Sequence, residues 1–249
     1  SSLSTSDYKP LTALMTQLLD YCEPRKINLS LPSLRADNFP EELAERLKAV
    51  RMSGLTFAPE AGTQRLRDVI NKNLTEEEIL TTCQTAFANG WNAVKLYFML
   101  GLPTETDEDV IGIALLAQKV LHTWRTYASN KKRGVRITVS TSYFVPKPDT
   151  PFQWEAQITP EEFTRRQRLL RDTINSHSIT YNWHEPEVSY LEAVLSRGDR
   201  RLADVLEYAV RHGARLDSWS EYFNNDTWME ALAACGVDPD HYGTRAWGE

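Results

Sequence analysis

The sequence predicts an α/β fold built on a parallel sheet, followed by a helical region. Short apolar runs alternate with longer amphipathic stretches over the first part of the chain, and strands that alternate with helices are typical of parallel α/β architectures. Residues 93–100 (AVKLYFML) form an almost continuous apolar run, which predicts a strand buried on both faces of the sheet. From Pro186 onward the pattern changes to consecutive helical segments. We therefore expect an α/β core over residues 1–185 and a helical extension over residues 186–249.

The individual elements follow from periodicity and from residues that cap helices. Thr75 and Glu78 form a capping box, and Asn89-Gly90 is a typical C-terminal stop. Acidic residues open the segment 107–127, where they suit the positive end of a helix dipole. The expected strands are 27–31, 55–57, 93–100 and 135–140; the expected helices begin near Pro10, Pro40, Thr63, Thr75, Asp107 and Pro160, with three more near 187–195, 200–212 and 226–235.

Composition and cysteine spacing exclude several classes of protein. No window approaches 18 consecutive apolar residues, so we expect no membrane-spanning segment and no membrane partner. A net charge of −6 argues against a surface built to bind phosphate backbones. Cys22, Cys83 and Cys235 lie far apart without any C-x-x-C, so no metal site and no disulfide framework is predicted within this sequence. A cytoplasmic location is the expectation.

Well-known catalytic and nucleotide-binding motifs are missing. The sequence has no G-x-G-x-x-G after a strand, no G-x-x-x-x-G-K-[ST] and no G-x-S-x-G. His184-Glu185 begins like H-E-x-x-H, but Val188 stands where the second histidine is required. The aromatic residues Trp219, Tyr222, Phe223 and Trp228 are expected to pack within the helical region.

Four polar segments are expected at the ends of strands. In parallel α/β folds, ligands bind beyond the carboxyl ends of the strands. The four segments are 4–8 (STSDY), 58–62 (APEAG), 101–106 (GLPTET) and 143–151 (YFVPKPDTP).

This ordered set resembles the radical S-adenosylmethionine (SAM) superfamily. Residues 99–106 (MLGLPTET) are similar to the fifth-strand loop of the methylthiotransferase and Elp-like branches, and 143–151 to their sixth-strand segment. Residues 59–63 (PEAGT) with 71–73 (NKN) resemble the fourth strand and its helix. More narrowly, the chain resembles uncharacterised radical SAM proteins that often carry a cobalamin-binding-like domain. The resemblance is good over about residues 1–155.

The resemblance implies a fold, two cofactors and a set of ligand-binding residues. The fold is an incomplete parallel (β/α)₆ half-barrel, similar to a partial TIM barrel, and the cofactors of the intact parent protein are SAM and a 4Fe–4S cluster. The implied SAM-binding residues are Glu60 at the ribose hydroxyls, Lys95 at the carboxylate, Ser6 and Asp7 at the amino group, and Gly101 and Pro103 in the adjoining loop.

Each of these residues also has an ordinary structural interpretation. A glutamate such as Glu60 is also common as a solvated residue of a loop or as a helix N-cap. A lysine such as Lys95 also occurs in strands where its ammonium group extends to the edge of the sheet. Ser6 and Asp7 could equally cap the helix that begins near Pro10. Gly101 and Pro103 shape a turn under either interpretation.

One departure from the family pattern is serious. The C-x₃-C-x₂-C that holds the cluster is absent, so we expect the chain to be a fragment whose first βα unit is missing and which is inactive alone. The intact parent is expected to cleave SAM reductively to methionine and a 5′-deoxyadenosyl radical. The sequence does not identify the substrate, for which a macromolecule is one option. It also leaves open whether the parent protein has a cobalamin-binding-like domain. The alternatives are a non-catalytic (β/α) binding domain and a metal-dependent aldolase-type barrel enzyme.

Overall fold

The computed structural model describes residues 10–27 and 55–246. The predictions for Ser6, Asp7, most of the strand 27–31 and the helix from Pro40 lie outside these described residues. The chain divides into two compact units. The first, called the sheet unit, comprises Ser1–Met99, Thr104–Thr141 and Leu169–Asn182; the second, called the helical unit, comprises Leu100–Pro103, Ser142–Arg168 and Trp183–Glu249. The boundary expected at residue 185 stays a prediction.

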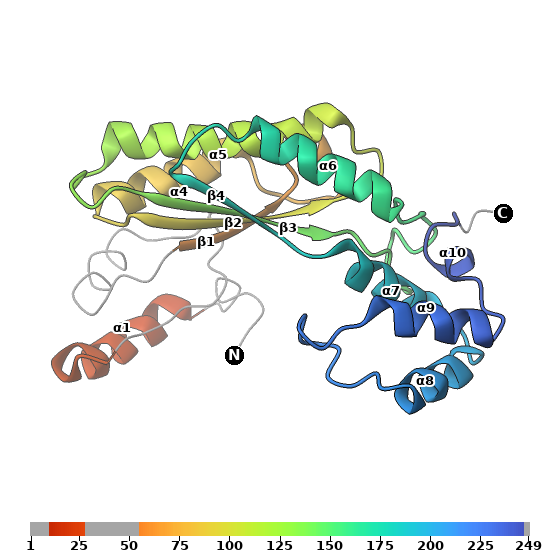
Figure 1. Cartoon of the computed structure of the whole chain (residues 1–249). Helices are drawn as coiled ribbons and strands as arrows, with labels where there is room; N and C mark the ends of the chain where they lie inside the picture. The colour runs from red at the N-terminus through yellow and green to blue at the C-terminus, as the bar shows by residue number, and fades with distance from the viewer. Residues whose placement is uncertain (1–9, 28–54, 247–249) are drawn as a thin grey trace. The chain divides into compact units, whose positions relative to one another are not determined.

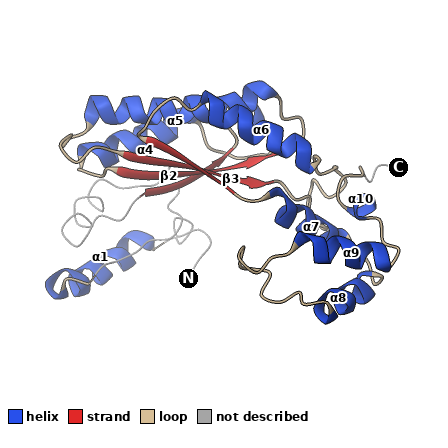
Figure 2. Cartoon of the chain, viewed as in Figure 1, coloured by secondary structure: helices blue, strands red, loops and turns tan. Residues whose placement is uncertain are grey.

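The sheet confirms the predicted α/β class. Four strands lie side by side in the order of the sequence, with helices between them along the chain (Figure 2). The first two strands pair in parallel. The strands are β1 (Leu55–Glu60), β2 (Ala93–Leu100), β3 (Arg136–Tyr143) and β4 (Ile179–Trp183), and the helices along the chain between them are α3 (Gln64–Val69), α4 (Glu76–Ala88), α5 (Asp107–Tyr127) and α6 (Pro160–Thr173). β4 was not among the strands that we predicted.

The two faces of the sheet differ, which corrects the prediction for β2. Val94, Leu96 and Phe98 are buried, whereas Lys95 and Tyr97 between them are exposed. The strand is therefore buried on one face only. The apolar run in the sequence does not show that one face is exposed. Tyr97 counts as a hydrophobic residue in such a pattern, and yet its side chain is 41% exposed.

Helices α4 and α5 pack against each other and cover the buried face of the sheet (Figure 1). Their buried side chains include Ile79, Phe87, Ile113 and Leu116. Burial of such side chains is the main favourable contribution to folding, about 1.5–3 kcal/mol for each. α4 begins and ends within a residue of the positions that Thr75 and Asn89-Gly90 predicted, and α5 spans the predicted segment 107–127.

The helical unit has a core of its own. Its helices are α7 (Pro186–Arg197), α8 (Leu202–Arg211), α9 (Asn225–Ala234) and α10 (Pro239–Tyr242). Leu191, Val194, Val205, Trp228 and Leu232 are among the residues that form this core. The expected packing of the aromatic residues is wrong for two of them, because Trp219 and Tyr222 are 60% and 57% exposed.

Two other elements lie in the N-terminal part of the chain. The helix expected near Pro10 is α1 (Leu11–Cys22), and a short 3₁₀ helix, η1 (Glu23–Arg25), follows it. Among the described residues, no helix is both long enough and apolar enough to cross a membrane.

The capping box of α4 yields a test of local stability. Thr75 Oγ1 accepts from Glu78 N at 3.2 Å, and Glu78 Oε2 accepts from Thr75 N at 2.7 Å. We expect Thr75→Ala to lower the free energy of unfolding by about 1 kcal/mol, measured by urea denaturation. Thr81→Ala is the matched control, because Thr81 is exposed in the middle of the same helix. Equal effects of the two substitutions would contradict the capping role.

Candidate functional site

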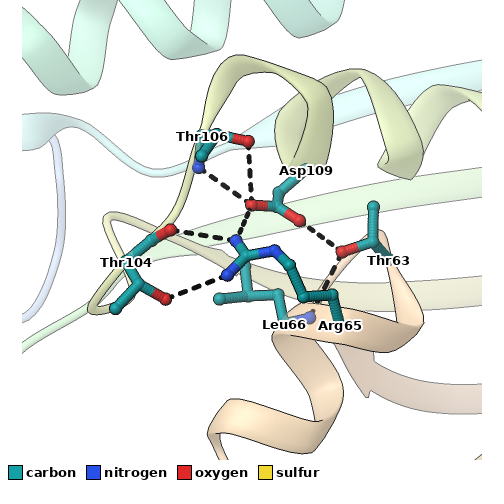
Figure 3. Close-up of polar contacts among 6 residues, drawn as sticks. All are labelled: Thr63, Arg65, Leu66, Thr104, Thr106 and Asp109. Carbon is teal, nitrogen blue, oxygen red and sulfur yellow. Dashed lines mark hydrogen bonds and ion pairs between the residues drawn. The ribbon is translucent and has the colours of Figure 1, made fainter.

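A buried carboxylate, Asp109, joins two helices of the sheet unit (Figure 3). Asp109 lies in the first turn of α5 and is 2% exposed. It accepts hydrogen bonds from Thr63 and Arg65, at the start of α3. It also accepts from Thr106 N at 2.9 Å and Thr106 Oγ1 at 3.1 Å. Four donors on two segments therefore meet one carboxylate, which holds the start of α3 against the start of α5.

The donors of this network have further contacts. Thr63 is the N-cap of α3, and its hydroxyl accepts from Leu66 N at 3.3 Å while it donates to Asp109. Arg65 Nη2 donates to Thr104 O at 2.9 Å, and Arg65 Nη1 to Thr104 Oγ1 at 3.2 Å. Thr104 has a left-handed backbone, with φ 66°. Arg65 therefore also holds the turn that precedes α5.

The charge of Asp109 follows from these donors. Burial alone raises the pKa of the Asp109 carboxyl, but the hydrogen bonds from Thr63, Thr106 and Arg65 outweigh burial and leave the pKa below its usual value. Asp109 is therefore a stable anion, held by neighbours that use its lone pairs. These contacts are typical of a positioning residue, and not of a proton donor.

Glu60 lies at the carboxyl end of β1, where the strand pairing is irregular. Phe57 pairs with Leu96 and Glu60 with Phe98, so β1 contains one extra residue at this point. Glu60 itself has a left-handed backbone, with φ 66°, a conformation that costs about 1–2 kcal/mol for a residue with a side chain. Its carboxylate accepts from Lys72 Nζ at 3.3 Å. The position at a strand end agrees with the sequence prediction.

Lys95 does not lie at the same level of the sheet as Glu60. It pairs with Thr56, near the amino end of β2, whereas Glu60 pairs with Phe98, three residues further along. Because a strand advances about 3.3 Å per residue, the two positions are about 10 Å apart along the strands. Ligands in parallel α/β folds bind beyond the carboxyl ends of the strands, and Lys95 does not lie at such an end. Lys95 is exposed, and no described residue forms an ion pair or a hydrogen bond with its ammonium group.

Gly101 and Pro103 belong to the helical unit, unlike Glu60 and Lys95. Gly101 has φ +86°, and a Cβ there would lie 2.8 Å from the side chain of Ile158. Both the left-handed backbone and the close neighbour require glycine. Pro103 lies in a turn with Thr104. The steric role that we expected for these two residues agrees with these observations.

The described residues do not fit an iron–sulfur cluster. Such a cluster needs several cysteine thiolates close together. No group of three or more His, Cys, Asp or Glu side chains that could hold a metal ion occurs in the described part of the chain. Cys83 is fully buried in α4, and burial raises its pKa to about 12, so its thiol stays protonated. Cys22 is the last residue of α1, and Cys235 directly follows α9.

Comparison with known proteins identifies the family of one segment of the chain. Residues 3–117 match the model of the radical SAM superfamily. This segment belongs to the radical SAM superfamily. It includes β1, β2, α3 and α4, and thus Glu60, Lys72 and Lys95. The chain is also similar to the uncharacterized protein MJ0966 of Methanocaldococcus jannaschii, at 31% identity over 206 residues. The match covers 83% of this chain but 42% of that protein, so the chain spans less than half the length of this relative.

Several residues of this region were missed at the level of sequence. The sequence predicts Asp109 only as one of the acidic residues that suit the helix dipole, although Thr106-x-x-Asp109 has the spacing of a capping box with aspartate in place of glutamate. Lys72 lies in the segment 71–73 (NKN), for which the sequence predicts no individual role. Nothing in the sequence indicates that Arg65 contacts Thr104, because the two residues are 39 positions apart.

Proposed function

We propose that the sheet unit is the SAM-binding part of a radical SAM enzyme, whose cluster is held by cysteines that lie outside this sequence. The observation that carries the proposal is the face of the sheet on which, among the described residues, the side chains of Lys95 and Tyr97 are exposed. Within a segment of this superfamily, one face is covered by α4 and α5, and the other carries the exposed side chains of Lys95 and Tyr97. In the longer protein, SAM and the cluster together would supply a 5′-deoxyadenosyl radical for hydrogen abstraction.

Glu60 is the residue that we propose for binding the SAM ribose. An ionised carboxylate has two acceptor oxygens and no donor, which suits two adjacent hydroxyl groups. The left-handed backbone and the contact with Lys72 hold this carboxylate at the end of β1. Lys72 is itself partly exposed, so the pair can rearrange when a ligand binds.

Lys95 has a different proposed role, because of its level in the sheet. A cation on an open sheet face attracts anionic groups of a ligand, and the superfamily resemblance assigns it to the SAM carboxylate. Its place near the amino end of β2 supports this assignment less well than the place of Glu60 supports the ribose contact. The contact between Lys95 and the SAM carboxylate is a proposal, which a Lys95 variant tests alongside a Glu60 variant.

Substitutions in the longer protein test the SAM site. We expect Glu60→Gln to raise the Kd for SAM about tenfold, because about 1.4 kcal/mol is lost with the charged acceptor. Equilibrium dialysis with SAM measures this, and Lys95→Met is examined in parallel. Glu77→Gln is the matched control, since Glu77 is an exposed carboxylate on α4. If Glu60→Gln and Glu77→Gln bind SAM equally well, the ribose assignment fails.

Iron content distinguishes the enzyme from a non-catalytic binding domain. We expect residues 1–249 alone, after anaerobic reconstitution, to hold far fewer than the about four irons of one 4Fe–4S cluster. The longer protein should contain a C-x₃-C-x₂-C, hold that cluster and form 5′-deoxyadenosine from SAM. A longer protein without the cysteine triplet would favour the non-catalytic domain, and a full cluster in residues 1–249 would show that our assignment of its ligands is wrong.

A further inference from the structure

Arg67 of α3 is a charged side chain in the interior of the sheet unit. It is 0% exposed, the most deeply buried charged side chain among the described residues. Its guanidinium forms no ion pair with a described carboxylate, and donates instead to two neutral oxygens, Ala61 O at 2.9 Å and Gln64 Oε1 at 3.1 Å. Burial lowers the pKa of Arg67, but an arginine in a protein stays ionised. A cation is therefore buried without a carboxylate in contact, which is costly.

The hydrogen bond from Arg67 to Ala61 bears directly on the end of β1. Ala61 follows Glu60 and is 1% exposed. Glu60 has the left-handed backbone described above, and such a conformation persists only where the surrounding structure holds it. On the other side, Gly62 lies against the backbone of α5. The turn formed by residues 60–62 is thus held at Gly62 by α5 and at Ala61 by Arg67.

The backbone of Arg67 contacts the other neighbour of Glu60. Arg67 O accepts from Lys72 N at 2.8 Å, and Lys72 Nζ forms the ion pair with Glu60. The contacts therefore close a ring that runs from Glu60 through Ala61, Arg67 and Lys72 back to Glu60. Within this ring the side chain of Arg67 holds the backbone beside Glu60, and Lys72 holds the carboxylate.

We propose that Arg67 is a positioning residue for SAM, which aims the Glu60 carboxylate at the ribose hydroxyls without touching the ligand. The inference rests on the ribose contact proposed for Glu60. Because Arg67 is fully buried, its effect on SAM passes through the turn 60–62. A binding group that is already held in place loses less conformational freedom when the ligand binds. Loosening the turn therefore weakens SAM binding even though the Glu60 carboxylate is still present.

A double-mutant cycle in the longer protein tests this role. Arg67→Met keeps an apolar stem and removes the donors, and we expect it to raise the Kd for SAM about tenfold, measured by equilibrium dialysis. Glu60→Ala removes the carboxylate that Arg67 is proposed to position. In that background Arg67→Met should change the Kd by less than about twofold, since residues that act through one contact are not additive. Equal factors in the two backgrounds would overturn the proposal.

Arg197→Met is the matched control. Arg197 is 8% exposed and donates through Nη1 to a backbone oxygen, Gly243 O, at 2.9 Å in the helical unit. Its loss also removes a buried hydrogen bond from an arginine to a carbonyl, but should leave the Kd for SAM unchanged. A rise in Kd as large as that of Arg67→Met would overturn the proposal, because any buried arginine would then have the same effect.

The same measurements separate this inference from the ribose assignment. A Kd that stays unchanged in Glu60→Ala would overturn the ribose contact, and the role of Arg67 with it. A raised Kd in Glu60→Ala with an unchanged Kd in Arg67→Met would overturn the role of Arg67 alone.

A second variant covers a failure of Arg67→Met to fold, which circular dichroism detects. Arg67→Lys then replaces it in the cycle, because lysine keeps the cation but is shorter and lacks the planar fork that reaches two acceptors. We expect Arg67→Lys to raise the Kd for SAM at least about threefold. A Kd equal to that of the natural protein would overturn the proposal.

Discussion

Replacing Asp109 with alanine is expected to lower the free energy of unfolding by about 3 kcal/mol. The carboxylate is buried and accepts from Thr63, Arg65 and Thr106. Removing it leaves these donors unpaired, and each such loss costs about 1–3 kcal/mol. Arg65 is half exposed, so water replaces part of its contact with Asp109. The expected cost is therefore the lower end of the range of about 3–5 kcal/mol for removing one partner of a buried ion pair.

The control for this substitution is Glu108→Ala, at the neighbouring position. Glu108 is exposed in the same first turn of α5, so its loss should cost no more than about 0.5 kcal/mol. Urea denaturation measures both variants, and hydrogen exchange at the amides of α3 and α5 locates the effect. A cost for Asp109→Ala as small as that for Glu108→Ala would show that the network does not hold these helices together.

The same carboxylate predicts a pH dependence. The pKa of Asp109 is lower in the folded chain than in the unfolded chain, where an aspartate titrates near pH 3.9. Its contribution to stability is therefore fully present well above about pH 3.9 and is lost as the pH falls toward the folded pKa. We expect acid to destabilise the natural chain more than Asp109→Asn. Parallel losses of stability in the two proteins between neutral pH and about pH 2 would contradict the lowered pKa.

Gly62→Ala is expected to be the other strongly destabilising substitution. A Cβ on Gly62 would lie 2.7 Å from Gly112 C, and closer still to Asp109 O and Ile113 N. All three are backbone atoms of α5, which cannot move aside as the end of a flexible side chain can. Relief therefore requires α5 to shift away from the end of β1, at a cost of about 3 kcal/mol or more.

Gly134→Ala separates this steric effect from the ordinary cost of replacing a glycine. Gly134 has φ +66°, and a Cβ there would have no neighbour within 4 Å. Gly134→Ala therefore costs only the free energy of holding alanine in a left-handed backbone conformation, about 1–2 kcal/mol. Denaturation midpoints of both variants provide the comparison. If Gly62→Ala is no worse than Gly134→Ala, the contact between residue 62 and α5 is looser than described.

Much of the fold could be predicted from the sequence because its signals are local. Thr75 with Glu78 marks the start of α4, and Asn89 with Gly90 marks its end, each through residues that are close in the sequence. β2 is apolar apart from Lys95. The order of strands and helices then predicts the α/β class, since parallel neighbours need a crossover between them. β4 was not predicted, although Ile179, Tyr181 and Trp183 alternate with polar residues in its sequence, ITYNW; only Ile179 of the five is buried.

The candidate site depends on contacts between distant segments. The sequence by itself determined that Glu60 follows a strand, that Gly101 lies in a turn and that residues 101–106 lead into a helix. Only the tertiary structure decided that Lys95 faces away from the core and pairs with Thr56. The reason is physical: the register between two strands and the choice of covered face are set by packing against α4 and α5. Likewise Asp109 became the centre of a network only when folding brought α3 beside the start of α5.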